Sequence, residues 1–432
     1  MKRPLLCGLP LLLAAALGNA LAFSAMSQDT STPAGTHMLT LETATRLAQS
    51  DNPDINALAA DIAYARGELT AATAWQNPEV SFTPGFKSVR NPSETQFHGD
   101  FGLAQTFEWP GKRALRRALA EKNVAVRKLA LAGFRSQLTV QVRHAYFALL
   151  AAREVIALRE QRVTLAGSFV AAARKKVEGG FAPEFEATKA EVEVVSAQKL
   201  LREAQARQAA AVVMLNTLMG RKPTEQLVVS GTLTGPIPLP VQSALLEQAL
   251  ARNPAVKIQE AEVERTGLSL QVVRQSRLPD FKVGPQVEYT PDEQIVGLGV
   301  SLPLPFWDNK QGEIAMATAG QEKALAELEK LSREILRDVI TASQNLTAAQ
   351  DSLAYYSPAL RDKLKTALVA AAQGYAEGRT PLLLYLESQR TYFDTQADYL
   401  ETLLKIFEAR AELESALGVP LNQLAQTATE SE

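Results

Sequence analysis

Side chains that could carry out chemistry are few in this sequence, and they are widely spaced. The chain has three histidines, His37, His98 and His144, and no two of them have the spacing of a metal-binding motif. The sequence contains no nucleophile elbow, phosphate-binding loop or zinc helix motif. Its glutamate pairs fall on segments with a heptad pattern, where carboxylates usually form a solvated helix face. We therefore predict no catalytic residue, no metal ligand and no cofactor, and we expect that the protein is not an enzyme.

Composition narrows the function classes further. The formal net charge is −2, and no long run of one charge sign occurs. Nucleic acid is therefore not an expected partner, because domains that bind it are usually basic. Only 6% of the residues are aromatic, and alanine is very common. This composition favours long, closely packed helices over a thick globular core.

The N-terminal segment has the pattern of a secretory signal peptide. Two basic residues precede an apolar stretch that ends in Ala-Leu-Ala, so we expect a signal peptide over residues 1–22. The only cysteine, Cys7, lies inside it, and the mature chain is expected to have no disulfide or thiolate ligand. After this segment no apolar run is long enough to predict a transmembrane helix. Residues 23–37 and 421–432 are expected to be flexible.

An internal repeat organises the rest of the chain. Several short patterns recur half a chain later: Asn52-Pro53 as Asn253-Pro254, Trp109 and Lys112 as Trp307 and Lys310, and Gly220 as Gly418. The segment between the copies is rich in glycine and proline, which is typical of a linker. We therefore predict a first repeat over 38–220, a linker over 221–240 and a second repeat over 241–420.

Each repeat is expected to contain very long helices. Apolar residues recur at spacings of three and four from Leu138 to Val177, from Ala190 to Leu218 and from Leu325 to Tyr356, with few exceptions. Heptads sustained over this length predict coiled-coil packing. A helix from Gly111 to Val177 would be ~100 Å long at the usual rise per residue. Taken alone, this pattern fits a structural rod.

Four segments argue against a simple rod, because apolar and polar residues alternate in them. They are residues 80–87 and 97–109, and in the second repeat 281–290 and 296–304, so the predicted strands fall within about 79–109 and 281–305. Their length and terminal aromatic residues match outer-membrane barrel strands. The alternative is a soluble hairpin on a helical body, which Pro84 and Pro285 favour.

Four strands cannot close a barrel, because the smallest transmembrane barrels have about eight strands. An open sheet edge is not tolerated in lipid, so several chains would have to pool their strands. In that case we expect Phe101 and Leu298 to face lipid, and Asp100 and Thr106 to face the lumen. The helices carry charges at every turn and must lie outside the membrane.

At this point the sequence resembles the TolC-type outer-membrane efflux proteins over nearly all of the mature chain. The segments "FEWPGKR", "KKVEGGFAPEFEATKAEVE" and "LPLPFWDNKQGEIAMA" resemble the CzcC-like branch, which serves heavy-metal efflux pumps. The resemblance implies a mainly α fold with four β-strands per chain. Three chains would form a twelve-stranded barrel in the outer membrane of a Gram-negative bacterium, continued by an α-helical barrel of coiled-coil helices in the periplasm. The aromatic residues at the ends of the strands would mark the membrane interface: Phe107, Trp109, Phe306 and Trp307.

The resemblance also assigns roles to two equivalent helical turns. Each has a glycine break followed by a proline, and they would dock a periplasmic membrane-fusion adaptor through Gly179, Gly180, Phe181, Gly378 and Pro381. Near the same turns, a gate would be formed by Glu387, Glu186, Arg379 and Thr380. Leu384 stands where the family has a second acidic residue. The carboxylates of the first turn could instead complement a helix N-terminus.

The function that follows is a passive duct without its own energy source. It would be the outer-membrane component of a tripartite efflux system, as a homotrimer that joins an adaptor and an inner-membrane RND-type pump. Heavy-metal cations are the expected cargo, and drug efflux or type I protein secretion are the alternatives. A periplasmic coiled-coil adaptor or structural protein is the alternative from a different class.

Overall fold

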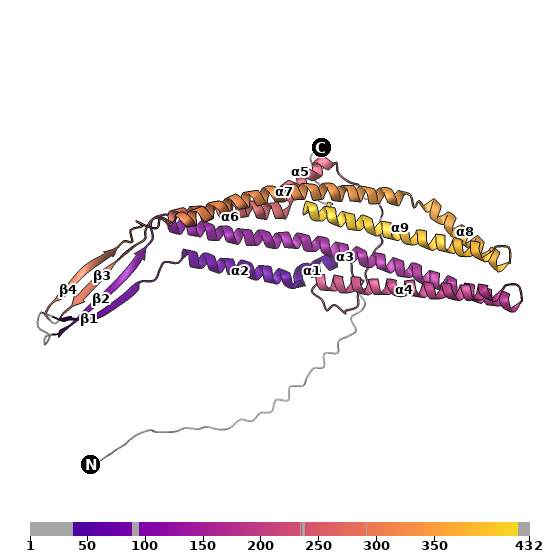
Figure 1. The fold of residues 1–432 in the computed structure, drawn as a ribbon, viewed down its shortest axis with the longest axis horizontal. Helices are drawn as coiled ribbons and strands as arrows, with labels where there is room; N and C mark the ends of the chain where they lie inside the picture. The colour runs from indigo at the N-terminus through magenta and orange to yellow at the C-terminus, as the bar shows by residue number, and fades with distance from the viewer. Residues whose placement is uncertain (1–37, 89–94, 234, 236–237, 291, 422–432) are drawn as a thin grey trace, which may run out of the picture. The chain divides into compact units, whose positions relative to one another are not determined.

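The computed structural model describes residues 38–88, 95–233, 235, 238–290 and 292–421 (Figure 1). Outside these ranges lie the predicted signal peptide and the predicted flexible segment 23–37. The predicted C-terminal tail also lies outside them, except for its first residue. Leu421, the first residue of that tail, is buried against the helices of the second repeat.

Two helices, two strands and a pair of long helices follow one another in the first repeat. The elements are α1 (Leu41–Asp51), α2 (Pro53–Thr73), β1 (Glu79–Ser88), β2 (Thr95–Phe107), α3 (Lys112–Glu178) and α4 (Glu184–Leu218). The second repeat has the same order in α5 (Gln242–Arg252), α6 (Pro254–Gln275), β3 (Phe281–Tyr289), β4 (Gln294–Ser301), α7 (Gln311–Ala354), α8 (Pro358–Ala376) and α9 (Leu382–Leu417).

The predicted long helices and the four predicted strands are confirmed, with differences at their ends. Strands β2 and β4 stop before the residues predicted to end them. Prolines at 303 and 305 cannot donate to a sheet ladder, and the Trp109 amide donates to the Asp280 carboxylate instead of the ladder. The second repeat divides its first long helix into α7 and α8. Pro358 is the first residue of α8, and the Ser357 hydroxyl caps it by accepting from the Leu360 amide at 3.3 Å.

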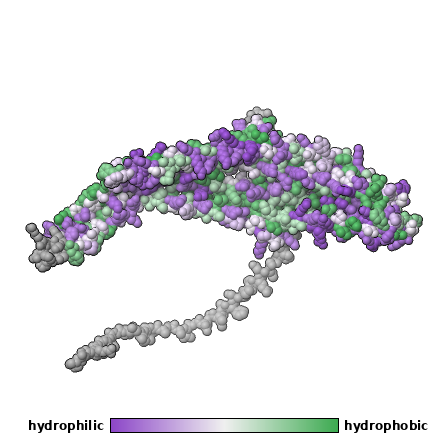
Figure 2. Space-filling view, viewed as in Figure 1, coloured by the Kyte–Doolittle hydropathy of each residue, from purple (hydrophilic) through white to green (hydrophobic). Residues whose placement is uncertain are grey.

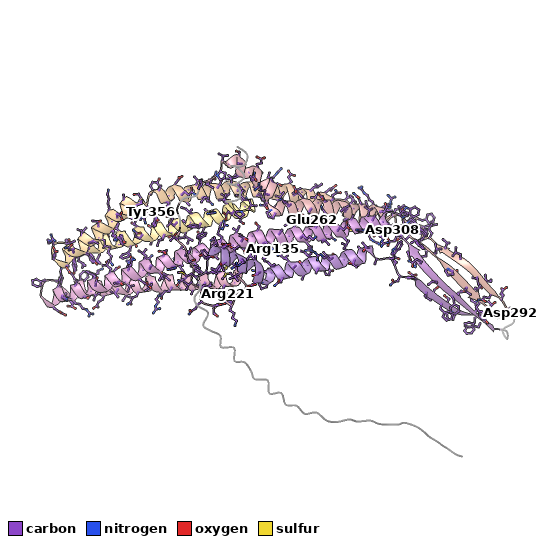
Figure 3. The ribbon with its side chains drawn as sticks, turned by 180° about the vertical axis from the view of Figure 1, so that it is seen from behind. Arg135, Arg221, Glu262, Asp292, Asp308 and Tyr356 are labelled. Carbon is purple, nitrogen blue, oxygen red and sulfur yellow. The ribbon has the colours of Figure 1, made fainter. Side chains whose placement is uncertain are left out.

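The strands form one antiparallel sheet in the order β1-β2-β3-β4. The central β2–β3 pair joins the two repeats, and Phe101 lies opposite Val287 and Asp100 opposite Glu288. Figure 3 places Asp292, between β3 and β4, at the free end of the sheet, and Asp308 where the strands meet the helices. Among the described helices, none combines the length and the apolar character needed to span a lipid bilayer.

Buried side chains form three clusters along the helices. The first lies among α1, α3 and α4, and includes Leu138 and Leu215. The second lies among α5, α7 and α9, and includes Leu245 and Leu413. The third joins the far ends of the long helices from both repeats. The first two clusters are mainly aliphatic, whereas the third contains Phe169, Tyr375, Tyr385 and Phe393.

The recurring Asn-Pro pattern is a helix joint that is built twice. The Asn52 side chain caps α2 by accepting from the backbone amide two residues later at 2.9 Å, and it donates to the Leu218 carbonyl at 2.9 Å. Asn253 caps α6 in the same way at 2.8 Å and donates to the Ala416 carbonyl at 2.7 Å. In each repeat, one buried amide thus ties a short helix to the end of a long one.

Glycine is required beside each joint for two reasons. Gly220 and Gly418 have left-handed backbones, with φ of 70° and 73°. A Cβ on Gly220 would lie 2.2 Å from the Asp51 carbonyl oxygen, and one on Gly418 would lie 3.0 Å from the Asn253 Cα. An alanine would therefore be strained in its backbone and would also collide with the crossing chain.

Candidate functional site

The sheet has two unlike faces, because the pleat sends alternate residues to opposite sides. One face carries exposed apolar side chains of every strand, and Figure 2 shows hydrophobic residues at the surface of the strand end. The exposed fractions are 80% for Val80, 50% for Phe101 and 70% for Leu298. Phe82 stacks on Phe101, with ring centroids 4.5 Å apart. Exposure of this much apolar surface indicates that another phase or partner covers it.

The opposite face is polar and rich in glycine. Lys282 of β3 pairs with Glu79 at 2.6 Å, from Nζ to Oε2. Farther from the helices, His98 and Asp100 of β2 approach Glu288 of β3. Thr106, which we predicted on this face with Asp100, is buried near the helix end of the sheet. The alternation predicted from the sequence is therefore confirmed, including which residues share each face.

The strands meet the helices at an aromatic junction. Phe107 stacks on Phe281, with centroids 5.7 Å apart. The Asp280 carboxylate accepts from the Trp109 amide at 3.1 Å and from the Lys112 ammonium group at 2.7 Å. This bridge joins the two repeats where β2 turns into α3. Trp307 is 93% exposed.

The other two predicted interface aromatics contact each other. Phe306 and Trp307 contact each other edge to face, with centroids 6.1 Å apart, in the segment between β4 and α7. Nearby, the Arg113 guanidinium lies 4.5 Å from the centre of the Trp75 ring.

The other end of the long helices carries two equivalent turns. We call residues 179–183 the first tip and residues 377–381 the second tip. Helix α3 ends where Gly180 takes φ 74° and the next amide donates to the Lys176 carbonyl at 2.8 Å. Helix α8 ends in the same way, with φ 76° at Gly378 and a 2.8 Å bond to the Gly374 carbonyl. Both are Schellman motifs, which let the chain reverse within a few residues.

Exposed apolar side chains surround both tips. Phe181 is 86% exposed and Phe185 is 62% exposed at the first tip. Leu383 and Leu384, just after the second tip, are 78% and 57% exposed. Exposure of large apolar side chains to water is unfavourable, so a group of them at a turn indicates a contact surface for a partner.

A hydrogen bond connects the helices beside the two tips within one chain. The Tyr375 hydroxyl, from α8, donates to Glu186 Oε2, from α4, at 2.8 Å. The Tyr375 ring is buried between Phe169 and Tyr385, with centroids 5.3 Å and 5.6 Å away. Lys176 donates to the Tyr375 carbonyl and lies 3.8 Å from the centre of its ring. Tyr375 is therefore held from every side by both repeats.

Burial explains the acid–base properties of this cluster. Burial raises the pKa of Tyr375 above its ordinary value, and the hydrogen bond to Glu186 makes the second largest contribution to this shift. Burial raises the pKa of Tyr385 to about 12, with a smaller contribution from Glu193. Both phenols therefore keep their protons at physiological pH, and Tyr375 remains a donor to the Glu186 carboxylate.

The other predicted gate residues lie at or just after the second tip, and none of them forms a hydrogen bond or ion pair with the first repeat in the described part of the chain. Glu387 is exposed on α9 and forms no ion pair with any described side chain. Arg379 pairs with Glu377, two residues earlier. Thr380 packs against Gly374, where a Cβ would lie 2.2 Å from its hydroxyl oxygen. Of the four predicted gate residues, only Glu186 forms a hydrogen bond or ion pair with the other repeat in the described part of the chain, and its partner Tyr375 was not predicted.

A buried ion network connects the repeats midway along the helices. The Glu414 side chain on α9 is fully buried and accepts from Arg143 of α3 at 2.7 Å through both oxygens. Arg410 and the Leu421 amide also donate to it, at 3.0 Å and 3.1 Å. Removing one partner of such a pair costs about 3–5 kcal/mol, because a buried charge is left uncompensated.

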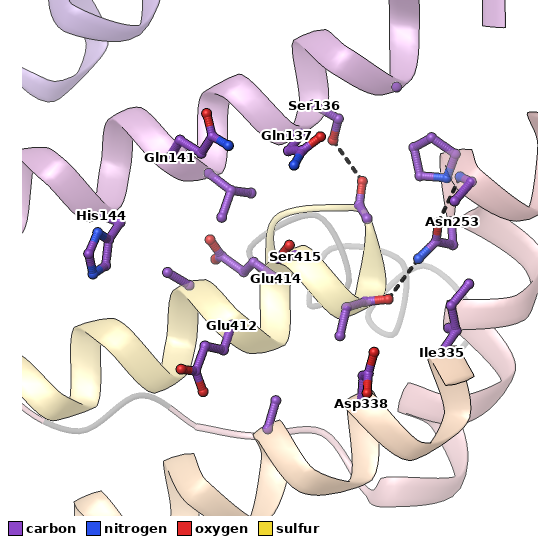
Figure 4. Close-up of a pocket in the computed structure, with 18 of the residues that line it drawn as sticks. Ser136, Gln137, Gln141, His144, Asn253, Ile335, Asp338, Glu412, Glu414 and Ser415 are labelled. Atoms are coloured by element: carbon purple, nitrogen blue, oxygen red, sulfur yellow. Dashed lines mark hydrogen bonds between the residues drawn. The ribbon is translucent and has the colours of Figure 1, made fainter. Parts of the chain in front are cut away.

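A cavity of about 1250 Å³ opens beside this network, lined by α3, α6, α7 and α9 (Figure 4). His144 faces it, and its Nε2 lies 3.9 Å from the Glu408 Oε1. The Glu408 carboxylate raises the pKa of His144, and burial opposes the shift. The imidazolium–carboxylate pair thus stabilises the fold at low pH, and this contribution is lost as pH rises through the raised pKa. We assign the cavity no catalytic role.

Comparisons with known proteins agree with this architecture. The model of the family described as "Outer membrane efflux protein" matches residues 44–221 and again 245–419. The cobalt-zinc-cadmium resistance protein CzcC of Cupriavidus metallidurans is 27% identical over 383 residues, which cover 88% of this chain and 90% of that protein. The pyoverdine export outer membrane protein OpmQ of Pseudomonas putida is 23% identical over 406 residues, 86% of this chain and 84% of that protein.

Solved structures share the fold. The structure of CusC has a TM-score of 0.74 to this chain at 16% identity, and the match covers 88% of this chain and 92% of that one.

Proposed function

The chain belongs to the outer membrane efflux protein family, and we propose that it forms the outer-membrane duct of a tripartite system that exports heavy-metal cations. The observation that carries the duct is the sheet. Strands β1 and β4 are its two edges, and one of its faces is apolar and exposed. Lipid does not tolerate open edges, so the sheet must be closed by further strands.

Closure by copies of the same chain satisfies this requirement. Three copies of a four-stranded sheet give twelve strands, enough for a barrel with an aqueous lumen. The apolar face then meets lipid and the polar face lines the lumen. The helices extend from the aromatic junction as a periplasmic tube. We therefore propose a homotrimer, with Phe107, Trp109, Phe306 and Trp307 at the periplasmic membrane interface.

The duct is passive in this proposal, and its energy comes from partners. The exposed apolar side chains at the tips suit end-on docking of a periplasmic membrane-fusion adaptor, through Gly179, Gly180, Phe181, Gly378 and Pro381. The adaptor would in turn join an inner-membrane pump of the RND type. Because both tips lie at the same end of the helices, one partner can contact both repeats of the chain (Figure 1).

Heavy-metal cargo is supported by the likeness to CzcC over nearly the whole chain. The likeness to OpmQ favours a second candidate, a small organic cargo such as a siderophore. Deleting the gene distinguishes them. We expect the deletion strain to become sensitive to zinc, cobalt or cadmium, and a plasmid copy to restore growth. Sensitivity confined to a panel of organic compounds would reject metal cargo.

We further propose that the tips form the gate of the duct. Tyr375 and Glu186 hold the tips of the two repeats together, and this link keeps the aperture narrow. Glu387 from each copy lines that aperture, where crowded carboxylates attract cations. Arg379 and Thr380 stiffen the second tip beside it.

Removing the Tyr375 hydroxyl should loosen the gate. We expect Tyr375→Phe to raise the single-channel conductance of the purified protein in a planar bilayer, because only the hydrogen bond to Glu186 is lost. In the same recordings, Glu387→Gln should lower the preference for cations and weaken block by divalent ions added on the periplasmic side.

Tyr385→Phe is the matched control for the first variant. Tyr385 lies in the same aromatic cluster and is equally buried, but its hydroxyl makes no hydrogen bond to a described residue. Its conductance should equal that of the wild type. If both tyrosine variants conduct alike, the Glu186 link does not hold the gate.

A further inference from the structure

Three side chains that can bind a metal meet on the polar face of the sheet. His98 and Asp100 are two residues apart on β2 and so share that face, and Glu288 lies opposite Asp100 on β3. One ligand atom from each residue lies within 4.8 Å of the other two. His98 Nε2 is 3.3 Å from Asp100 Oδ1, and its Nδ1 is 3.7 Å from Glu288 Oε1.

The two carboxylates are not neutralised by cationic side chains. Among the side chains that the structure describes, Asp100 and Glu288 form ion pairs with His98 alone. The His98 Nδ1 is itself shielded from solvent and makes no hydrogen bond in the described part of the chain. Two negative charges and an uncommitted ring nitrogen therefore share one small space, an arrangement that a bound cation would satisfy.

An imidazole binds an ion through one of its two nitrogens, and the 3.3 Å and 3.7 Å distances start from different nitrogens. The spacing that matters is therefore the 4.8 Å limit within which one ligand atom of each residue lies from the other two. Two ligands at about 2.1 Å from one tetrahedral zinc ion lie about 3.4 Å apart. The side chains are 27%, 33% and 46% exposed for His98, Asp100 and Glu288, so they have room to turn toward a common centre. Gly85 lies opposite His98 on the neighbouring strand, and a Cβ there would lie 3.6 Å from the His98 Cδ2.

We propose that His98, Asp100 and Glu288 form a binding site for a divalent transition-metal cation of the zinc, cobalt and cadmium class. One imidazole and two carboxylates suit these ions, whereas magnesium prefers oxygen ligands alone. Three protein ligands leave a position for water, so the ion can exchange.

The place of the site in the duct rests on the proposed function. His98 is near the start of β2, and Glu288 is near the end of β3, so both belong to the end of the sheet farthest from the helices (Figure 3). In the proposed barrel this end is the outer mouth, and its polar face is the lumen. A trimer would carry three such sites around the exit.

Cobalt binding by the purified, detergent-solubilised protein tests the proposal. The absorption bands of Co²⁺ report nitrogen and oxygen ligands directly, and competition with Zn²⁺ gives the relative affinity. We expect one bound Co²⁺ per chain. His98→Asn and Glu288→Gln should each weaken binding about tenfold or more, by analogy with the effect of losing groups that support metal ligands. Mg²⁺ should not compete.

His144→Asn provides the matched control. His144 also faces a glutamate, at 3.9 Å, but lies on a helix away from the sheet. Its loss should leave Co²⁺ affinity unchanged, and each variant is first checked for the assembly state of the wild type. His98→Cys keeps a ligand and should shift the preference from Zn²⁺ toward Cd²⁺, because a thiolate is softer than imidazole.

The outcomes separate this proposal from the proposed function. If His98→Asn and Glu288→Gln bind Co²⁺ as tightly as the wild type, or if His144→Asn loses as much affinity as they do, there is no such site. That result would not contradict the proposed function as an outer-membrane duct. If the deletion strain tolerates metals normally while His98→Asn loses Co²⁺ binding, metal cargo is rejected and the site stands.

Discussion

Phe101→Arg and Leu298→Arg are expected to abolish stable assembly in the outer membrane. Both side chains lie on the apolar face, on β2 and β4, and both are at least half exposed in the single chain. If this face meets lipid, a basic residue near the middle of the bilayer costs roughly 2–4 kcal/mol, and every copy in the proposed trimer bears that cost. Cell fractionation and native mass measurement should show loss of the membrane-embedded trimer.

Gln286→Arg is the matched control for this prediction. Gln286 is exposed on β3, and its register partners are Gly102 and Gly297, on the polar face. An arginine there points into the proposed aqueous lumen and should assemble like the wild type. Equal tolerance of arginine on both faces would mean that the sheet does not face lipid on either side.

Gly378→Pro is expected to abolish efflux in cells while trimers still form. Proline fixes φ near −65°, and Gly378 has φ 76°, so the second tip cannot keep its turn. The sheet and the first two clusters of buried residues contain no residue of this turn, whereas the third cluster includes Tyr375, three residues before Gly378. Assembly through the sheet should therefore continue. The measurements are metal tolerance of the complemented deletion strain and the mass of the purified protein.

Gly378→Asn tests whether efflux requires the left-handed turn or requires glycine as such. Asparagine accepts the left-handed backbone better than other residues with a Cβ, and a Cβ at Gly378 would meet no other atom within 4 Å. This variant should restore most of the tolerance. Normal efflux by Gly378→Pro would show that the tip does not dock a partner.

Much of the architecture could be predicted because it rests on local periodicity. Alternation along β2 and β3 identifies strands with two faces, and heptads identify the long helices. The division of α7 from α8 was missed, since the heptad pattern ends at Tyr356 and a new helix starts at Pro358 without a marked change in composition. The ends of strands were predicted a few residues too long where prolines follow.

The contacts between the repeats could not be predicted in the same way. Tyr375 meets Glu186 only because α8 packs beside α4, and the sequence places them in different repeats. Glu288 joins His98 only through the β2–β3 register, which no local pattern specifies. The spacing of His98 and Asp100 was the available signal, since residues two apart on a strand share a face. The third ligand, Glu288, is distant in the sequence and could be predicted only if the pairing of β2 with β3 were known.

The mass of the purified protein in detergent is the most direct test of the central claim, that several copies pool their strands into a membrane barrel. Native mass spectrometry should give three chains per particle, with the trimer lost when the detergent is removed. A stable, water-soluble monomer would contradict the barrel, because one chain supplies only a four-stranded sheet with two open edges.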